Sequence, residues 1–167
     1  MTGSNIVLVG FMGTGKSAVG QRLAQALHRA FVDMDALIES RAGKPIPRIF
    51  REDGESHFRD IERAVVRELA KKREQVIAAG GGVVLDQGNI REFSRSGLVV
   101  CLSASQEELV RRLSGSTDRP LLKKGDHAGG ISDLLKKRQP FYDAIPAQVD
   151  TTGLTVEEVV SRILVML

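Results

Sequence analysis

The chain has 167 residues, of which 42% are hydrophobic and 27% are charged, and it contains a single cysteine. This composition is typical of a water-soluble globular protein, and the length suits one domain with its own core. One cysteine excludes an intramolecular disulfide bond, and no apolar run approaches the ~20 residues that span a bilayer. The first residues show no basic segment followed by a cleavage site, so we expect a cytoplasmic protein.

The formal net charge is +3 at neutral pH, which suits anionic ligands but is too small to indicate nucleic-acid binding. His28, His57 and His127 are far apart in the sequence and lack the spacing of metal ligands. Cys101 lies in an apolar run and is expected to be a buried, small hydrophobic residue. We expect a monomer that binds a small molecule, with no nucleic acid or membrane as partner.

Short apolar runs alternate with amphipathic stretches along the chain. The apolar runs predict β-strands, and the first, third and fourth lack polar alternation, as strands covered on both faces do. The expected strands are residues 6–9, 30–32, 76–79, 98–102 and 147–149. The expected helices are residues 16–28, 55–72, 90–94, 106–113, 131–141 and 156–167, the last with a capping box at Thr155 and Glu158.

Strands that are joined by helical crossovers form a parallel sheet with helices on both faces. The sequence therefore predicts a single α/β domain over residues 1–167, with three α/β/α layers and a five-stranded parallel sheet. Ligands of such sheets bind at the carboxyl ends of the strands, where functional residues are expected.

The first expected strand runs into residues 10–17, GFMGTGKS, which match the P-loop pattern G-x-x-x-x-G-K-[ST]. The glycines of this loop expose successive backbone N–H groups to phosphates at the N-terminus of the following helix. Lys16 can reach the β- and γ-phosphates, and Ser17 can ligate Mg²⁺. The pattern, placed between a strand and a helix, predicts that the chain binds a nucleoside triphosphate.

Features of other P-loop classes are missing from the sequence. It contains no N-K-x-D tetrapeptide, with which GTPases bind guanine. The fourth expected strand ends in Cys101, Leu102 and Ser103, without the acidic pair of motor and transport ATPases. A small-molecule or nucleotide kinase remains, and such an enzyme needs an acceptor site and a lid.

Two acids, Asp33 and Asp35, follow the second expected strand. Residues i and i+2 of an extended segment point to the same side, so both carboxylates are expected at the catalytic crevice. One acid can hold water on Mg²⁺, and the other can accept a hydrogen bond or a proton from the acceptor hydroxyl. The alternative is that Asp35 only caps the helix that follows it.

Arg59 and Glu62 are three residues apart on an expected helix, so they share one face of it. Glu62 could hold the Arg59 guanidinium in one orientation, ready to bind a ligand carboxylate through two hydrogen bonds. The alternative is a solvated ion pair on the surface, which is the usual arrangement for charges at this spacing.

Two further arginines lie later in the chain. Arg119 belongs to a polar, glycine-containing stretch over residues 114–130, a composition that suits a mobile lid. An arginine in a lid could neutralise the phosphoryl group during transfer. Arg138 precedes a proline in a helical region. Runs of charge usually face solvent, so neither arginine alone indicates a function.

Three consecutive glycines, Gly80, Gly81 and Gly82, end the third expected strand. Each costs about 0.5–1 kcal/mol relative to alanine inside an element, so bare backbone should serve a purpose here. A side chain would occupy the space that a flat ring needs, and we expect the segment to form a wall of the acceptor pocket. The alternative is a flexible turn between strand and helix.

The motifs GFMGTGKS, DMD, IFREDGESHFRDIE, AAGGGVV, DRPLL and RQPFYDA follow one another along the chain. In this set and order the sequence resembles the shikimate kinase family over essentially its whole length. The resemblance implies a P-loop NTPase type of fold, with a substrate-binding region at about 33–62 and a lid at about 114–130. It also implies ATP as phosphoryl donor, Mg²⁺ as metal and shikimate as acceptor.

The resemblance further implies roles for individual residues. Those that would bind ATP are Gly13, Thr14, Gly15, Lys16, Ser17, Ala18, Arg112 and Arg119, with Arg112 stacked on adenine. Ser17 would ligate Mg²⁺, and Asp33 would assist through water. Shikimate would be bound by Asp35, Arg59, Gly80, Gly81, Gly82 and Arg138, in a pocket walled by Phe50 and Phe58. The catalytic residues would be Lys16, Asp35 and Arg119.

The expected reaction is ATP-dependent phosphorylation of the 3-hydroxyl of shikimate, which gives shikimate 3-phosphate and ADP. Two arginines for one carboxylate would make the acid group the main determinant of specificity. Two alternatives remain: another kinase of the same fold, such as one that acts on gluconate, and a non-catalytic protein that binds a nucleotide to regulate a partner.

Overall fold

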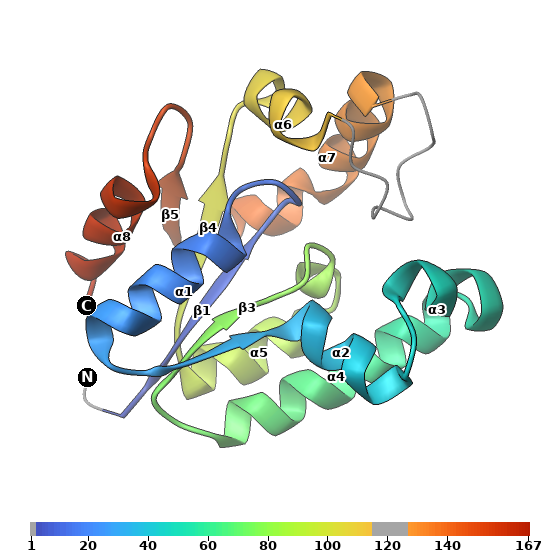
Figure 1. Ribbon diagram of the computed structural model, residues 1–167, viewed down its shortest axis with the longest axis horizontal. Helices are drawn as coiled ribbons and strands as arrows, with labels where there is room; N and C mark the ends of the chain where they lie inside the picture. The colour runs from blue at the N-terminus through green and yellow to red at the C-terminus, as the bar shows by residue number, and fades with distance from the viewer. Residues whose placement is uncertain (1–2, 115–126) are drawn as a thin grey trace.

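A computed structural model describes residues 3–114 and 127–167 of the chain (Figure 1). Its centre is a parallel sheet with the strand order β2-β3-β1-β4-β5. The strands are β1 (Asn5–Gly10), β2 (Ala30–Asp33), β3 (Gln75–Ala78), β4 (Gly97–Ser103) and β5 (Ala147–Asp150). Each coincides with an expected strand to within two residues at either end. The predicted α/β class with a five-stranded parallel sheet is therefore confirmed.

Helices cover the two faces of the sheet. They are α1 (Lys16–Leu27), α2 (Met34–Ala42), α3 (Ile46–Asp53), α4 (Glu55–Lys71), α5 (Gln87–Ser96), α6 (Gln106–Leu113), α7 (His127–Asp143) and α8 (Val156–Leu164), with a 3-10 turn, η1 (Val83–Leu85), after β3. Figure 1 shows α1 and α8 on one side of the sheet and α4 and α5 on the other. No helix in the described ranges is long and apolar enough to cross a membrane.

The central strand β1 is buried along its whole length, which explains its uninterrupted apolar sequence. Val7 and Val9 pack on the face that α4, α5 and α7 cover. Ile6 and Leu8 point to the opposite face, among buried residues of α1 and α8. The two-residue period of a strand thus divides one apolar run between two core clusters.

Helix α3 was not expected from the sequence, and a helix at the position of α2 was expected only within the alternative that Asp35 caps one. Helix α2 begins directly at the end of β2, with no loop residue between them, because Asp33 both ends the strand and caps the helix. Helix α3 begins at Ile46, with Pro45 as its N-cap and Pro47 in its first turn, where prolines are tolerated because backbone N–H groups there lack helical partners. The chain there turns back over α4 and closes one side of a cavity.

Two other helices are longer than expected. Helix α5 begins at Gln87 because the Asp86 side chain accepts a hydrogen bond from the backbone N–H of Gly88. Helix α7 continues through Pro140 to Asp143 and was expected only over residues 131–141. The capping box of α8 is confirmed, since Thr155 and Glu158 each bond the other's backbone N–H.

Candidate active site

The P-loop joins β1 to α1 at the carboxyl edge of the sheet. Gly15 caps α1 in the left-handed conformation, with φ of 95°, which a glycine adopts without steric cost. The Lys16 ammonium group donates hydrogen bonds to the backbone carbonyls of Gly10 (2.8 Å) and Phe11 (2.9 Å). The Thr14 hydroxyl donates to the same Phe11 carbonyl at 2.8 Å. The loop is thus held at the N-terminus of α1, where phosphates are favoured.

Asp33 faces the P-loop from the end of β2. The Ser17 hydroxyl donates to Asp33 Oδ2 at 2.8 Å, and the backbone N–H of Ala36 donates to Asp33 Oδ1 at 3.2 Å. Asp33, not Asp35, is therefore the N-cap of α2, which corrects the alternative considered for Asp35. Both acids do line one pocket, but through the first turn of α2: Met34 between them starts the helix and is fully buried.

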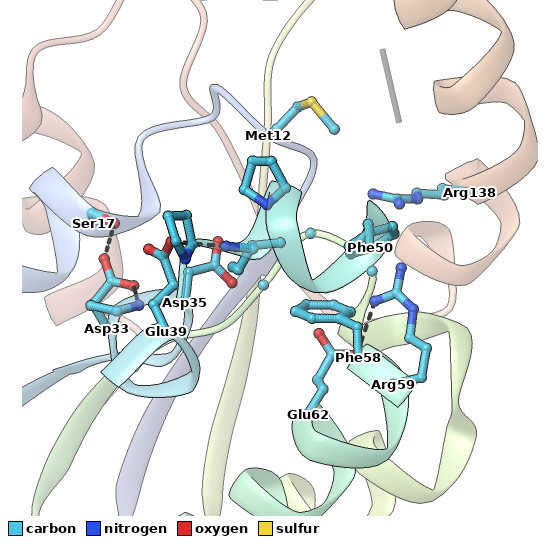
Figure 2. Close-up of a pocket in the computed structure, with 17 residues that line it drawn as sticks. Met12, Ser17, Asp33, Asp35, Glu39, Phe50, Phe58, Arg59, Glu62 and Arg138 are labelled. Atoms are coloured by element: carbon cyan, nitrogen blue, oxygen red, sulfur yellow. Dashed lines mark hydrogen bonds and ion pairs between the residues drawn. The ribbon is translucent and has the colours of Figure 1, made fainter. Parts of the chain in front are cut away.

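A cavity of about 530 Å³ opens beside Ser17 and Asp33. Figure 2 shows the acids Asp33 and Asp35 near Ser17, and the guanidinium groups of Arg59 and Arg138 at the opposite side of the cavity. Further lining comes from Gly80, Gly81 and Gly82, from Phe50 and Phe58, and from residues that the sequence did not indicate, Met12 and Glu39 among them. The three glycines do form a wall of the pocket, as expected.

Phe50 and Phe58 close the pocket from α3 and α4. Their ring centroids are 4.9 Å apart, with an angle of 42° between the ring planes. The Arg59 guanidinium carbon lies 5.1 Å from the centroid of the Phe58 ring, close enough for a cation–π contact. Together with Pro45, Ile46 and Pro47, these rings give the pocket an apolar side.

Arg59 and Glu62 form a pair on α4 in which Glu62 is buried and Arg59 is partly buried. Arg59 Nη1 donates to Glu62 Oε1 at 3.0 Å, and Nη2 donates to Glu55 Oε1 at 3.3 Å. Glu62 is only 1% exposed, so the alternative of a solvated surface pair is wrong. Burial raises the pKa of the Glu62 carboxyl, and the adjacent Arg59 opposes that rise. Glu62 fixes one end of the guanidinium, as the sequence spacing predicts.

Arg138 and Tyr142 are four residues apart on α7 and point toward the same segment of chain. Arg138 is 3% exposed, and its buried Nε has no hydrogen-bond partner in the described residues. The Tyr142 hydroxyl donates to the Gly81 carbonyl at 2.6 Å. Burial raises the pKa of Tyr142 to about 12, so its hydroxyl stays a donor at neutral pH. Helix α7 thus supplies a cation to the pocket and anchors its glycine wall.

Arg112 lies against the P-loop from α6. Its Nη1 donates to the Gly13 carbonyl and to Thr151 Oγ1, both at 3.1 Å, and its Nε donates to Glu108 Oε1 at 2.9 Å. This placement at the edge of the P-loop is compatible with the expected stacking on adenine, which stays a prediction. Arg119 and most of the expected lid lie outside the described residues.

The sequence did not indicate Glu39 as a site residue, although a signal existed. Glu39 follows Asp35 by four residues, so the two share one face of α2 and both reach the cavity. The Glu39 carboxylate also accepts a hydrogen bond from the Ile46 backbone N–H at 2.9 Å. Glu39 could have been found only if the helix over residues 34–42 had been recognised.

The P-loop lies next to a pocket with acids on the near side and guanidinium groups on the far side. This arrangement defines a small-molecule kinase for an acidic acceptor. Comparison with known proteins narrows this class. The family model described as shikimate kinase matches residues 12–167, and the chain belongs to that family.

Individual relatives agree with the family match. A shikimate kinase of Thermodesulfovibrio yellowstonii is 46% identical over 160 residues, which cover 96% of this chain and 92% of the relative. A structure of the Acinetobacter baumannii shikimate kinase in complex with shikimate superposes with a TM-score of 0.94 at 36% identity, covering 99% of this chain and 93% of that one. A gluconokinase of Sinorhizobium meliloti, at 22% identity and a TM-score of 0.62, covers 97% of this chain and 90% of its own, and shares the fold alone.

Proposed function

We propose that the protein transfers the γ-phosphoryl group of ATP to the 3-hydroxyl of shikimate. The products are ADP, shikimate 3-phosphate and the proton that the hydroxyl loses. The observation that carries this proposal is the polarity of the pocket: acids lie beside the P-loop, and Arg59 and Arg138 lie across the cavity from them (Figure 2). Membership of the shikimate kinase family supports it.

Arg59 and Arg138 would hold the carboxylate of the acceptor. Guanidinium groups bind carboxylates through parallel hydrogen bonds, and such charge-assisted bonds are the stronger ones. Because Arg59 is braced by Glu55 and Glu62, it is already oriented before the acceptor arrives. Binding the acid group at this side turns the rest of the ring toward Asp35 and the P-loop.

Asp35 would bind the ring hydroxyls and orient the one that attacks phosphorus. It lies in the first turn of α2 and lines the cavity on the side of Ser17. In the reaction the oxygen of the hydroxyl forms a bond to the γ-phosphorus while the bond from that phosphorus to the bridging oxygen of ADP breaks. Asp35 accepts the hydrogen bond of the hydroxyl and is the group positioned to take its proton.

The donor side of the site fits ATP with Mg²⁺. The residues expected to hold the phosphates, Gly13 to Ala18, form the loop and first turn of α1, and Lys16 lies within the loop. Ser17 Oγ and Asp33 Oδ2 are 2.8 Å apart, so the hydroxyl that would ligate Mg²⁺ and the carboxylate that would hold a water molecule on it are already adjacent. When bound, Mg²⁺ would neutralise charge on the phosphates. Lys16 and Arg119 would add positive charge there.

The test is an ADP-release assay with shikimate, quinate, gluconate and a nucleoside monophosphate as acceptors. We expect the highest kcat/KM with shikimate, and we expect Asp35→Asn to lower kcat by about 10²–10⁴-fold, the usual range for a lost general base. Lys136→Ala, which alters an exposed residue of α7, is the control. Highest activity on gluconate would favour the alternative kinase. ATP binding without ADP release on any acceptor would favour the non-catalytic alternative.

We also propose that the protein acts as a monomer in the cytoplasm, without a nucleic-acid or membrane partner. Its small net charge and ordinary globular composition support this. Sedimentation at micromolar concentration should give the mass of one chain, with or without shikimate, and a dimer would contradict the proposal.

A further inference from the structure

The three glycines of the pocket wall are not explained by their backbone conformation. Several glycines of the described chain have positive φ, but Gly80, Gly81 and Gly82 are not among them. Gly82 has φ of −94° and ψ of 4°, which residues with a side chain also adopt. A different property of glycine, the absence of a Cβ atom, must therefore matter at this position.

At each of the three positions a charged side chain lies against the space where a Cβ would stand, and at Gly82 it fills that space. A Cβ on Gly82 would lie 2.7 Å from Cζ of Arg59 and closer still to both terminal nitrogens of that guanidinium. A Cβ on Gly81 would lie 3.2 Å from Arg138 Nη1, and one on Gly80 would lie 3.0 Å from Asp35 Oδ1. The sequence predicts that the ring of the acceptor occupies this space. In the structure, the side chains of Arg59, Arg138 and Asp35 occupy or border it.

The contact at Gly82 is the tightest of the three, and it concerns a guanidinium that is restrained from other sides as well. Glu62 and Glu55 each hold one terminal nitrogen of Arg59, and the Phe58 ring lies next to its guanidinium carbon. Because those partners are fixed on α4, the missing side chain of Gly82 determines how closely the Arg59 guanidinium can approach the backbone between β3 and η1. A methyl group there would push Arg59 away from this position.

We propose that Gly82 is a positioning residue, whose missing Cβ sets the place of the Arg59 guanidinium and thereby the affinity for the acceptor carboxylate. This inference rests on the proposed function, in which Arg59 binds that carboxylate. Because the atoms that must move are the far end of a flexible side chain, Gly82→Ala should disturb Arg59 without disrupting the backbone.

A double-mutant cycle between Gly82→Ala and Arg59→Ala tests the inference. We expect Gly82→Ala to lower kcat/KM for shikimate by about 10–100-fold, as the loss of a charge-assisted contact does, mostly through KM. Its kcat and its KM for ATP should change by less than about threefold. In the Arg59→Ala background the space is vacant, so adding Gly82→Ala should change kcat/KM by less than about twofold.

The matched control is Gly81→Ala, the same substitution one residue earlier. Its Cβ would meet Arg138 instead of Arg59, so its effect should persist in the Arg59→Ala background. The inference is overturned if Gly82→Ala leaves the KM for shikimate unchanged, or if its effect is the same with and without Arg59.

Thermal unfolding provides a second measurement that does not depend on activity. If Gly82→Ala is poorly folded, Gly82→Ala should lower the Tm less in the Arg59→Ala background than in the wild type, because the obstructing guanidinium is then gone. An equal loss of Tm in both backgrounds would overturn the inference. If the wild-type protein does not phosphorylate shikimate, the proposed function fails, and this stability cycle still decides whether Gly82 places Arg59.

Discussion

Glu62 is the residue whose environment differs most from what its sequence context suggests. An acid within a helix of mixed charge usually faces water, but Glu62 is buried between the Arg59 guanidinium and the Gly80 backbone. Its Oε2 has no hydrogen-bond partner in the described residues. Burial of the carboxylate therefore costs stability that the ion pair with Arg59 only partly offsets. The proposed role of Arg59 in binding the acceptor carboxylate gives a reason for this cost, because Glu62 holds the guanidinium in place.

The raised pKa of Glu62 predicts a dependence of stability on pH. Between its unfolded pKa near 4.3 and its higher folded pKa, the native state binds more protons than the unfolded state. The proton that the native state holds on Glu62 stabilises the fold. This contribution is complete below the unfolded pKa and is lost as the pH rises through the folded pKa. The quantity to compare is the Tm of the wild type minus the Tm of Glu62→Gln. We expect this difference to be lower at pH 8 than at pH 5.

Thermal unfolding of both proteins at the two pH values checks this prediction. Glu107→Gln, which changes an exposed acid of α6, is the control for the loss of one carboxylate. A difference between wild type and Glu62→Gln that stays constant from pH 5 to pH 8 would contradict it.

At the scale of secondary-structure elements, α7 links two parts of the proposed acceptor site. Arg138 and Tyr142 lie one turn apart, so one face of the helix delivers a guanidinium to the pocket and a hydroxyl to the Gly81 carbonyl. The position of the glycine wall thus depends on a helix more than fifty residues away in the sequence. Pro140 interrupts neither contact, since α7 continues through it.

We expect Tyr142→Phe to remove the hydrogen bond that the half-buried Gly81 accepts at its carbonyl. This should lower the free energy of unfolding by about 0.5–1.5 kcal/mol, the usual net contribution of one hydrogen bond. The KM for shikimate should rise because the glycine wall is less firmly held, while the KM for ATP stays the same. Chemical denaturation and initial-rate kinetics, with Lys136→Ala on the same helix as control, check both effects. An equal rise in both KM values would show that α7 does not act on the acceptor site specifically.

At the scale of the whole molecule, the site joins segments from most of the chain. Its residues run from Met12 in the P-loop to Arg138 on α7, and they meet because β1 and β3 are neighbours in the sheet. The elements over residues 33–62 close the cavity from one side. A ligand in this cavity therefore contacts several elements at once and should stabilise the folded state as a whole.

Because the cavity is built from several elements, binding of shikimate there should raise the Tm of the protein. Shikimate at 100 times its Kd should add about 2.7 kcal/mol to the free energy of unfolding, which corresponds to about 5–10 °C for a domain of this size. Differential scanning calorimetry with increasing shikimate measures the shift. Arg59→Ala at the same concentrations should show a smaller one. No shift at concentrations that saturate the activity assay would contradict binding to the folded cavity.

The sequence by itself determined the features that depend on residues close together along the chain. Uninterrupted apolar runs predicted the buried strands, and the pattern GFMGTGKS predicted the phosphate-binding loop, because hydrophobic periodicity and turn chemistry are local. The spacing of Arg59 and Glu62 likewise predicted their contact on α4. Helix α2 was missed because it follows β2 without a loop, and so no break in the sequence marks its start.

Only the tertiary structure decided which side chains share one space. Asp33 rather than Asp35 caps α2, Glu62 is buried rather than solvated, and the Arg59 guanidinium fills the place of a Cβ on Gly82. Each of these outcomes depends on how close two elements pack, and that distance is set by the sheet order and by helices from other parts of the chain. A local pattern carries no information on that distance, because the residues that meet are neighbours in space and not in sequence.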